Sequence, residues 1–431
     1  MRRKNLRRTS TVLLATAIAA VLAACSNTGA QPSADNTKPD SGATLTMWAR
    51  NTSNNLAQQI VDQYNATHDN DINLTIVPND AYQQKVAAAA ASGNLPDLIA
   101  SDVVNSPNYV KQGLFLDVTD RVKKLPFYAS LSQAHMNAAS ANGKIYGTPF
   151  ILDSSLILYN KTLFKQAGLD PDKGPANFEE IYQDAKAVRE KVGGDVYGFY
   201  FGGNCHGCNA YTMFGYLAAA GDQPFKEDGK AANFDTPAMK ATLDLYKRLW
   251  DDGLVAPGAE AEDGVTWNTL FTEGKIGILP RGTGLFAGLA TAKFDWGVVP
   301  LPSPDGSGTS GFVGGDVAAI SSSSKHVEQA WNFLEWTLSD EAQVEVIAKN
   351  GSLPSRVDLA DNKYSSANPN VVTAIKGLAN GYTPSTTAYA AAINNPNGPW
   401  LAMVRGYVFD NKPSAVADGQ QAIQKVLDQF K

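Results

Sequence analysis

Two cysteines of this chain stand close enough together to do chemistry as a pair, in the segment Cys205-His-Gly-Cys208. Thiols at this spacing can form a disulfide, bind a metal ion or take part in redox exchange. A zinc ion would need further ligands, and the other histidines form no spaced cluster with this pair: His68, His135 and His326. A redox-active thiol favours a helix start, whereas glycines precede this pair. In an oxidising compartment we therefore expect a disulfide rather than a metal site; metal binding and redox exchange are the alternatives.

A third cysteine, Cys25, ends the segment Leu22-Ala-Ala-Cys25, behind a basic start and a short apolar run. The run is too short to span a bilayer, so residues 1–24 are predicted to be a cleaved signal peptide. The small residues before Cys25 resemble a bacterial lipobox, which implies cleavage there and a diacyl lipid anchor on the thiol. An ordinary signal with a chance cysteine is the alternative. We expect an extracytoplasmic protein that is lipid-anchored to the cell membrane.

The charge of the mature protein limits its partners. Residues 1–24 carry five basic residues and no acidic one, so their removal changes the formal net charge from −6 to −11. An acidic chain without a basic block should repel phosphate backbones, and we expect no nucleic-acid partner. Residues 26–43 contain proline, glycine and polar residues but no aromatic or branched apolar residue. Residues 25–43 are therefore predicted to be a lipidated cysteine and a disordered tether.

From residue 44 the hydrophobic pattern alternates between strands and helices. It predicts strands over 44–48, 72–77, 96–100, 275–279 and 317–320, and helices over 55–64, 82–91, 178–192, 237–252 and 327–338. The tail over 400–430 is predicted to be helical with a break near Pro413. Such alternation favours an α/β fold with a parallel sheet and helices on both faces.

Three segments, in a fixed order, carry a family resemblance. They are NGKIYGTP (142–149) followed by LILYNK (156–161) and Phe164, then FTEGKIGI (271–278) leading to GGDVAAI (314–320), and finally residues 336–350 followed by GSLPSR (351–356). Their order and spacing resemble the family 1 extracellular solute-binding proteins of bacterial ABC importers, the group that includes maltose-binding protein. The resemblance covers residues 44–431 and implies an α/β, two-lobed periplasmic-binding-protein-like fold with a hinge between the lobes.

The resemblance implies that the chain crosses between the lobes more than once. Lobe one is expected to hold residues 44–152 and 317–356, and lobe two residues 155–313 and 357–431. The hinges are expected near 153–154, 314–316 and 356–357. Glycines at 314 and 315 tolerate the backbone change that a hinge requires. A ligand is expected in the cleft between the lobes, and closure would exclude water from it.

The resemblance also implies a sugar, most simply an oligosaccharide, as the ligand. Aromatic rings cover the apolar face of a pyranose, while Asp, Asn and Arg bind the hydroxyls at its rim. Candidates of these types at strand ends and in loops are Trp48, Asn51, Asp102, Asp153, Trp267, Arg281 and Asp316. For some of them a structural role is the alternative: the core for Trp48, turn caps for Asp153 and Asp316, and a surface ion pair for Arg281.

Further candidates come from the family pattern alone. Ligand-contacting residues of lobe two carry over to Asn204, His206 and Tyr211. The family's cleft tryptophan carries over to Trp400, which is predicted to stack on a sugar ring. The family often has an aromatic residue at the position of Asp316, and an aspartate there indicates a polar contact with a hydroxyl instead.

The resemblance implies a monomeric receptor without catalysis or cofactor, whose partners are the ligand and the permease subunits of an ABC transporter. A secreted glycosidase is the main competing hypothesis, and it would need two carboxylates on either side of one glycosidic bond. The adjacent pairs Glu179-Glu180 and Asp251-Asp252 are typical of solvated helix faces, and no nucleophile elbow occurs. The sequence also leaves open a surface adhesin and a binding protein for a polyol or another uncharged solute.

Overall fold

The computed structural model describes residues 37–51 and 55–430. The predicted signal peptide and the predicted lipidation site Cys25 lie outside the described residues. Among the residues that are described, no helix is both long enough and apolar enough to cross a membrane.

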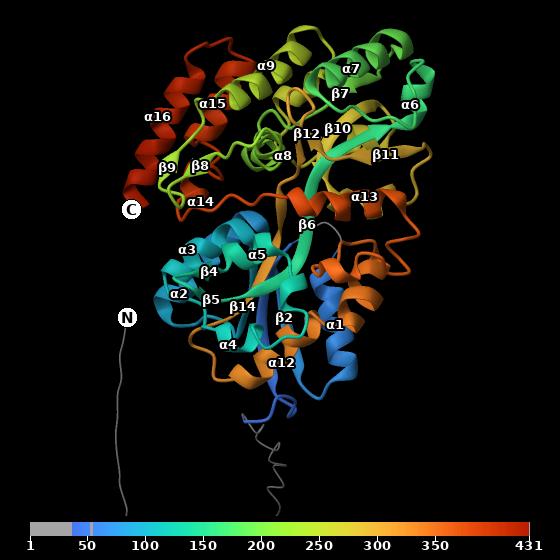
Figure 1. Cartoon of the computed structure of the whole chain (residues 1–431). Helices are drawn as coiled ribbons and strands as arrows, with labels where there is room; N and C mark the ends of the chain where they lie inside the picture. The colour runs from blue at the N-terminus through green and yellow to red at the C-terminus, as the bar shows by residue number, and fades with distance from the viewer. Residues whose placement is uncertain (1–36, 52–54, 431) are drawn as a thin grey trace, which may run out of the picture. The chain divides into compact units, whose positions relative to one another are not determined.

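One mixed sheet runs through the body and organises it (Figure 1). The strand order is β2-β1-β3-β14-β6-β10-β7, and β11 also pairs with β6. The bounds are β1 Thr44–Arg50, β2 Asp71–Val77, β3 Leu98–Asp102, β6 Thr148–Asn160, β7 Tyr197–Phe199, β10 Ile276–Gly282, β11 Trp296–Val299 and β14 Val313–Ile320. The pairs β1–β2, β1–β3 and β10–β7 are parallel. The prediction of a parallel sheet is wrong for its centre, because β14 runs antiparallel to β3 and β6, and β6 antiparallel to β10 and β11.

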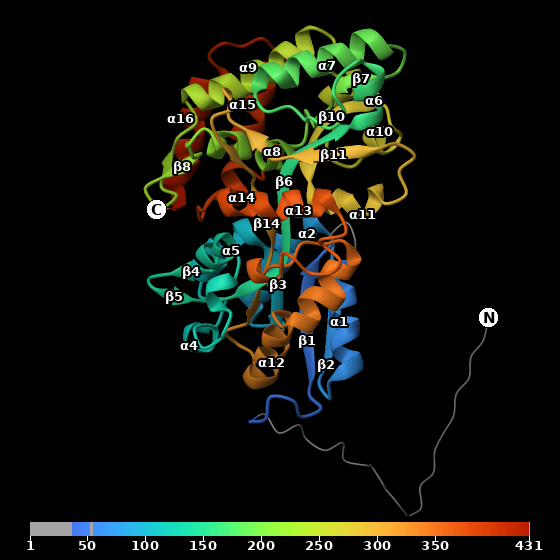
Figure 2. The ribbon, with the colours of Figure 1, turned by 45° about the vertical axis from the view of Figure 1, so that its right-hand side comes forward.

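The long strand β6 changes partners along its length. Residues 148–154 pair with β14, whereas residues 155–160 pair with β10 and β11. We call the elements around β1, β2 and β3 lobe one and those around β7, β10 and β11 lobe two. The strands β6 and β14 run side by side from one to the other (Figures 1 and 2). The boundaries and hinge positions expected from the sequence stay predictions.

The helices of lobe one include three that the sequence predicts. They are α1 Leu56–Thr67, α2 Asn79–Ser92, α3 Ser106–Lys111, α4 Thr119–Val122, α5 Gln133–Ala138 and α12 Val327–Thr337, beside the short strands β4 Ser140–Ala141 and β5 Lys144–Ile145. In α1 the residues Leu56, Ile60, Val61 and Tyr64 recur at helical spacing, and all are buried. The helices predicted over 55–64, 82–91 and 327–338 are confirmed, with ends that differ by a few residues.

Lobe two contains most of the remaining helices. They are α6 Lys161–Gln166, α7 Phe178–Val192, α8 His206–Ala219, α9 Pro237–Asp251, α10 Thr269–Thr272, α11 Phe286–Leu289, α13 Pro369–Gly377, α14 Tyr389–Ala392, α15 Pro399–Val408 and α16 Ala415–Leu427. Short strand pairs join them: β8 Phe225–Lys226 with β9 Ala231–Ala232, and β12 Leu301–Pro302 with β13 Thr309–Ser310. The predicted break near Pro413 is confirmed, because α15 ends at Val408 and α16 begins at Ala415.

The segment before β1 is held against lobe one. The side chain of Asn70 accepts hydrogen bonds from the backbone of Ser41 and Ala43, each at 3.1 Å, and donates one to the carbonyl of Pro39 at 2.8 Å. Gln329 donates a hydrogen bond to the carbonyl of Lys38. The expectation that the disordered tether extends to residue 43 is therefore wrong for its last residues, because hydrogen bonds to side chains of lobe one compensate for their lack of apolar surface.

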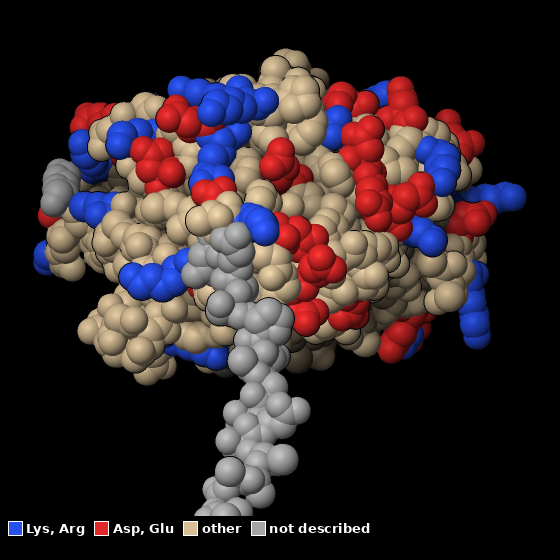
Figure 3. Space-filling view, turned by 90° about the horizontal axis from the view of Figure 1, so that it is seen from below, with Lys and Arg blue, Asp and Glu red and all other residues tan. Residues whose placement is uncertain are grey.

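The surface at this end of the molecule is mixed in charge. Seen from below in Figure 3, acidic and basic side chains alternate over much of the face, and acidic ones gather on the right of the view. Interspersed charges of this kind favour solubility and give no single strong field over the face.

Candidate ligand-binding site

Charged side chains from three neighbouring strands meet at the ends of β1 and β3. The guanidinium of Arg50 contacts Asp102 with Nη1 at 3.0 Å from Oδ2, donates through Nε to Asp316 Oδ1, and donates through Nη2 to the carbonyl of Gly315 at 3.2 Å. Asp102 and Asp316 lie opposite each other in the β3–β14 register, which is why one arginine reaches both. We call Arg50, Asp102 and Asp316 the Arg50 cluster.

Burial and pairing act in opposite directions in this cluster. Burial acts to lower the pKa of Arg50, but the carboxylates of Asp102 and Asp316 outweigh it and raise that pKa. Asp316 is fully buried, and burial raises its pKa while Arg50 opposes the rise. The second carboxylate oxygen of Asp316, Oδ2, is buried without a hydrogen-bond partner among the described residues. The cluster therefore has an unused acceptor beside a fixed positive charge.

A second polar group forms where β6 passes between the lobes. Oδ1 of Asp153 accepts hydrogen bonds from Thr283 Oγ1 at 2.5 Å and from the backbone N–H of Gly284 at 3.1 Å. The hydroxyl of Tyr211, from α8, lies near this carboxylate, and both border Gly282. A Cβ atom added at Gly282 would lie 2.6 Å from the Tyr211 hydroxyl and 2.7 Å from Asp153 Oδ2. Burial raises the pKa of Tyr211, and the charge of Asp153 raises it further. The Tyr211 hydroxyl has no hydrogen-bond partner among the described residues.

Arg281 lies next to this second group and rests on an aromatic ring. Its guanidinium is 4.4 Å from the centre of the Trp267 ring, and its Nε donates to Asn268 Oδ1 at 2.7 Å. Burial lowers the pKa of Arg281, while Asp153 and Tyr211 oppose that change. The indole N–H of Trp267 is buried and has no partner within the described ranges.

A cavity of about 140 Å³ lies between lobe one and the segment around α14. It is lined by Gln83, Val86, Ala87, Val104, Asn105, Asn108, Tyr109, Gln112, Leu114, Thr387, Tyr389 and Ala390. None of these side chains is charged, and four carry amides. The hydroxyl of Tyr109 is buried without a partner in the described part of the chain. The backbone N–H of Val104, which lines the cavity, donates to Asp102 Oδ1 at 3.3 Å, so the cavity adjoins the Arg50 cluster. Beside the effect of burial, Asp102 raises the pKa values of Tyr109 and Tyr389.

The structure brings five of the predicted ligand-binding residues together: Asp102, Asp153, Tyr211, Arg281 and Asp316. Trp267 joins them through its contact with Arg281. Trp48 is half-buried on the same face of β1 as Arg50, with Lys85 Nζ 4.2 Å from its ring centre. Asn51 is exposed, next to the undescribed residues 52–54.

Trp400 lies elsewhere. It is fully buried, its ring packs against Phe214 and Phe234, and its indole N–H donates to the carbonyl of His206 at 2.9 Å. The prediction that Trp400 stacks on a sugar ring is wrong for this structure, because the apolar face of α15 that carries it packs into the core of lobe two.

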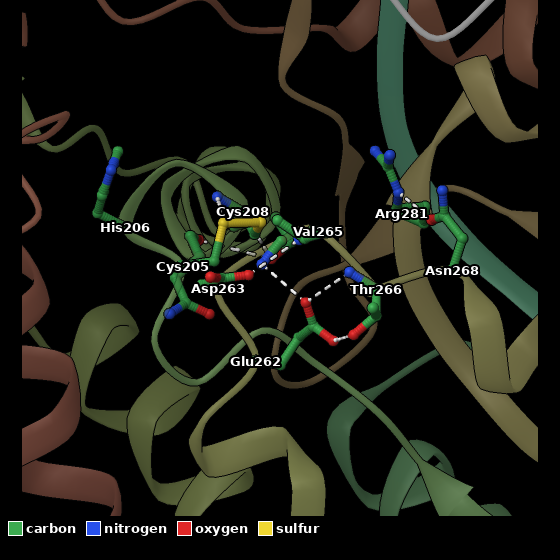
Figure 4. Close-up of a disulfide and its surroundings, with 12 residues drawn as sticks. Cys205, His206, Cys208, Glu262, Asp263, Val265, Thr266, Asn268 and Arg281 are labelled. Atoms are coloured by element: carbon green, nitrogen blue, oxygen red, sulfur yellow. Dashed lines mark hydrogen bonds between the residues drawn. A yellow bond between two sulfur atoms is a disulfide. The ribbon is translucent and has the colours of Figure 1, made fainter. Parts of the chain in front are cut away.

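Two other candidates lie at the cysteine pair. Asn204 is exposed, and its backbone N–H donates to the carbonyl of Glu262 at 2.9 Å. His206 is half-buried and points away from the side of Asn268 and Arg281, with the disulfide between them (Figure 4). Neither is part of the polar groups described above.

Cys205 and Cys208 are joined by a disulfide in the structure, with their Cα atoms 5.2 Å apart. The expectation that the pair does not stand at a helix start is wrong, because Cys205 caps α8 and its sulfur accepts the backbone N–H of Cys208 at 3.1 Å. Across residues 37–51 and 55–430, no group of three His, Cys, Asp or Glu side chains is arranged to hold a metal ion.

Several residues of the site were not among the predicted ones. Arg50 is two residues after Trp48, so the period-two alternation of a strand could have placed both on one face. Thr283 and the two cavity tyrosines, Tyr109 and Tyr389, gave no such signal. They come from segments far apart in sequence, and only folding brings them to the site.

Comparisons with known proteins agree with this architecture. The family described as bacterial extracellular solute-binding protein matches residues 49–344, which is more than half of the chain. The chain is 26% identical over 365 residues to the diacetylchitobiose binding protein DasA of Streptomyces coelicolor, covering 83% of each protein. The solved cyclic alpha-maltosyl-1,6-maltose binding protein of Arthrobacter globiformis is 25% identical, with a TM-score of 0.75 over 90% of this chain and 99% of that one. A solute-binding protein of Agrobacterium radiobacter solved with ribitol is 21% identical, with a TM-score of 0.76 over 91% of this chain and 100% of the other.

Proposed function

This chain belongs to the bacterial extracellular solute-binding protein family, and from that premise we propose that it is an extracytoplasmic carbohydrate receptor. It binds a sugar, specifically an oligosaccharide, between its lobes and delivers it to the permease subunits of an ABC importer. Closure of the lobes over the ligand is the step that readies it for delivery. It acts as a monomer, without a cofactor and without catalysis.

The observation that supports a carbohydrate most strongly is the set of unpaired polar atoms at the site. They include a pure donor, the indole N–H of Trp267, a pure acceptor, Asp316 Oδ2, and two hydroxyls that can do both, those of Tyr109 and Tyr211. Buried polar groups without partners are costly, so a ligand that supplies both donors and acceptors stabilises them. Sugar hydroxyls have this property, and the uncharged lining of the cavity suits a neutral ligand.

The place of action follows from the start of the chain. Residues 1–24 direct export, and a lipid on Cys25 holds the receptor at the outer surface of the membrane. In that oxidising environment Cys205 and Cys208 stay paired.

A polyol is the second candidate ligand. The cavity of about 140 Å³ is small compared with most ligand pockets, which favours a ligand of about one sugar ring in size or smaller in this conformation.

Calorimetric titration of the mature protein against a panel of oligosaccharides, monosaccharides and polyols tests the proposal. We expect one class of sugar to bind and Asp153→Asn to weaken that binding by about tenfold or more, because the substitution removes the negative charge that acts on the Tyr211 hydroxyl. Binding of a polyol alone would favour the second candidate. Hydrolysis of any oligosaccharide of the panel would show that the protein is an enzyme, and the absence of any binding would reject both candidates.

A further inference from the structure

We propose that the Cys205–Cys208 disulfide and the carboxylate of Glu262 together position one wall of the ligand site, through the loop of residues 262–268. This inference rests on the proposed function for its ligand. Figure 4 shows the order of the contacts, from the disulfide across the loop to Arg281.

The disulfide lies between two stretches of backbone that only glycine allows to come so close. A Cβ added at Gly264 would be 2.9 Å from Cys205 Sγ and 3.0 Å from Cys208 Sγ, and one at Gly202 would be 2.9 Å from Cys205 Cβ. Gly264 also has a φ of 103°, a conformation that other residues rarely adopt. The loop backbone therefore rests directly on the two sulfurs, and a change in their separation is transmitted to it.

Glu262 closes the same loop from inside. It is 5% exposed, and its carboxylate accepts hydrogen bonds from the N–H of Gly264 at 2.8 Å, from the N–H of Thr266 at 3.1 Å, and from the hydroxyl of Thr266. The hydroxyl of Tyr200 donates to it at 3.2 Å. A buried carboxylate with this many donors is rigidly held, so the turn over residues 262–266 has one conformation.

The far end of the loop supports Arg281. Trp267 follows Thr266 directly, and 4% of its side chain is exposed. The guanidinium of Arg281 packs on the Trp267 ring, and Asn268 Oδ1 accepts a hydrogen bond from Arg281 Nε. The charge of Arg281 in turn acts on Asp153 and Tyr211. Movement of the loop therefore changes where the positive charge stands relative to the ligand-binding acceptors.

The tip of this loop faces solvent. Val265, at its tip, is 85% exposed, so no packing on the solvent side replaces the contacts on the inner side. When a dithiol such as dithiothreitol reduces the pair, it supplies two electrons and two protons, the S–S bond breaks, two thiols form and the reductant becomes a cyclic disulfide. The two sulfurs then need more space than a bonded pair, and that space is taken from Gly264 or Gly202.

The first arm of the test needs no ligand. Hydrogen exchange of the mature protein is followed with and without dithiothreitol, and we expect faster exchange at residues 262–268 on reduction with unchanged exchange in β1 and β3. Uniformly faster exchange over the whole chain would overturn the inference, because the disulfide would then be a general support of the fold. Unchanged exchange in the loop would overturn it too.

The second arm measures affinity by calorimetry for the oligosaccharide of the panel that binds the oxidised protein most tightly. Reduction and the double variant Cys205→Ser/Cys208→Ser should each weaken binding by about tenfold, with little change in the melting temperature of the unliganded protein. Glu262→Gln should weaken binding with the disulfide intact, whereas the neighbouring exposed Asp263→Asn should leave it unchanged. Equal affinity in all of these proteins would overturn the inference. If no sugar binds the oxidised protein, the proposed function fails while the exchange arm still decides whether the disulfide holds the loop.

Discussion

Arg50 is the residue on which the charged part of the site depends. It is half-buried and contacts two carboxylates and a carbonyl from β3 and β14. Removing one partner of a buried ion pair leaves the other charge without compensation, which costs several kcal/mol. Single residues are therefore of two kinds: some side chains support the fold, and others are available to a ligand.

Trp400 belongs to the first kind. We expect Trp400→Ala to lower the stability of the unliganded protein by about 3–5 kcal/mol, because the ring is fully buried among Phe214, Phe234 and their neighbours. Ligand affinity of the folded fraction should stay nearly unchanged, in contrast to Asp153→Asn. Thermal unfolding and calorimetry on the same variant check both statements. A large loss of affinity with unchanged stability would return Trp400 to the ligand site.

His135 makes the stability depend on pH. It is fully buried in α5, and burial lowers its pKa from 6.5 to about 4. The charge of Arg50 lowers the pKa further, whereas hydrogen bonds with the backbone of Ile151 and Gly314 oppose the shift. Between about pH 6.5 and pH 4, His135 binds a proton in the unfolded chain but not in the folded protein. The free energy of unfolding therefore decreases progressively as the pH falls through that window. The effect should reach about 3 kcal/mol near the lower end.

Melting temperatures measured from pH 7 to pH 4 test this, with His135→Gln as the comparison. We expect the variant, relative to its own value at pH 7, to lose less stability on acidification than the unchanged protein. Parallel pH profiles of the two proteins would contradict the assignment of this window to His135.

At the scale of elements, the pair β6–β14 connects the two lobes. The register of this pair shifts between Asp316 and Val317, next to Gly315, whose φ is 107°. A Cβ at Gly315 would lie 2.0 Å from the carbonyl oxygen of Ile151 on β6. The irregularity also places Gly315 O within reach of Arg50, so the geometry of the crossing and that of the site are coupled.

Gly315→Ala is expected to destabilise the protein by more than the roughly 1 kcal/mol of conformational strain alone, because the added methyl group meets backbone that cannot move aside. It should also weaken sugar binding, since Arg50 and Asp316 flank the position. Gly143→Ala is a matched control with positive φ of 76° and nothing within 4 Å of the added atom. Thermal unfolding of both variants measures the difference, and equal losses would show that backbone strain alone accounts for the effect.

At the scale of the whole molecule, the folded body begins before the first strand. Asn70 and Gln329 hold residues 38–43, so the body includes residues that the sequence assigned to the tether.

Ligand binding should change the shape of the body. If the lobes close over a sugar, small-angle scattering of the mature protein should give a smaller radius of gyration with the bound sugar than without it. The melting temperature should rise with sugar concentration, because only the folded state binds the ligand. Tight binding with identical scattering curves would argue against closure.

Membrane attachment should depend on one thiol. Cys25→Ser is expected to release the protein from the membrane fraction into the soluble exported fraction, because a single substitution removes the acceptor of the lipid. Fractionation followed by detection of the protein measures the distribution, and export itself should be unaffected. Unchanged membrane association of the variant would mean that something other than the lipid retains the protein.

The sequence by itself determined the helices α1, α7, α9 and α12, the strands around them and the family, because hydrophobic periodicity and motif order are local properties of the chain. It also marked Asp102, Asp153, Arg281 and Asp316 by their positions at strand ends. Only the tertiary structure decided that Trp400 belongs to the core and that Trp267 lies under Arg281, since burial depends on what packs opposite a residue. The same holds for the antiparallel centre of the sheet, the ordered residues 38–43 and the cavity between Tyr109 and Tyr389. Each of these arises from contacts between residues far apart along the chain, and such contacts leave no pattern in the spacing of the residues that make them.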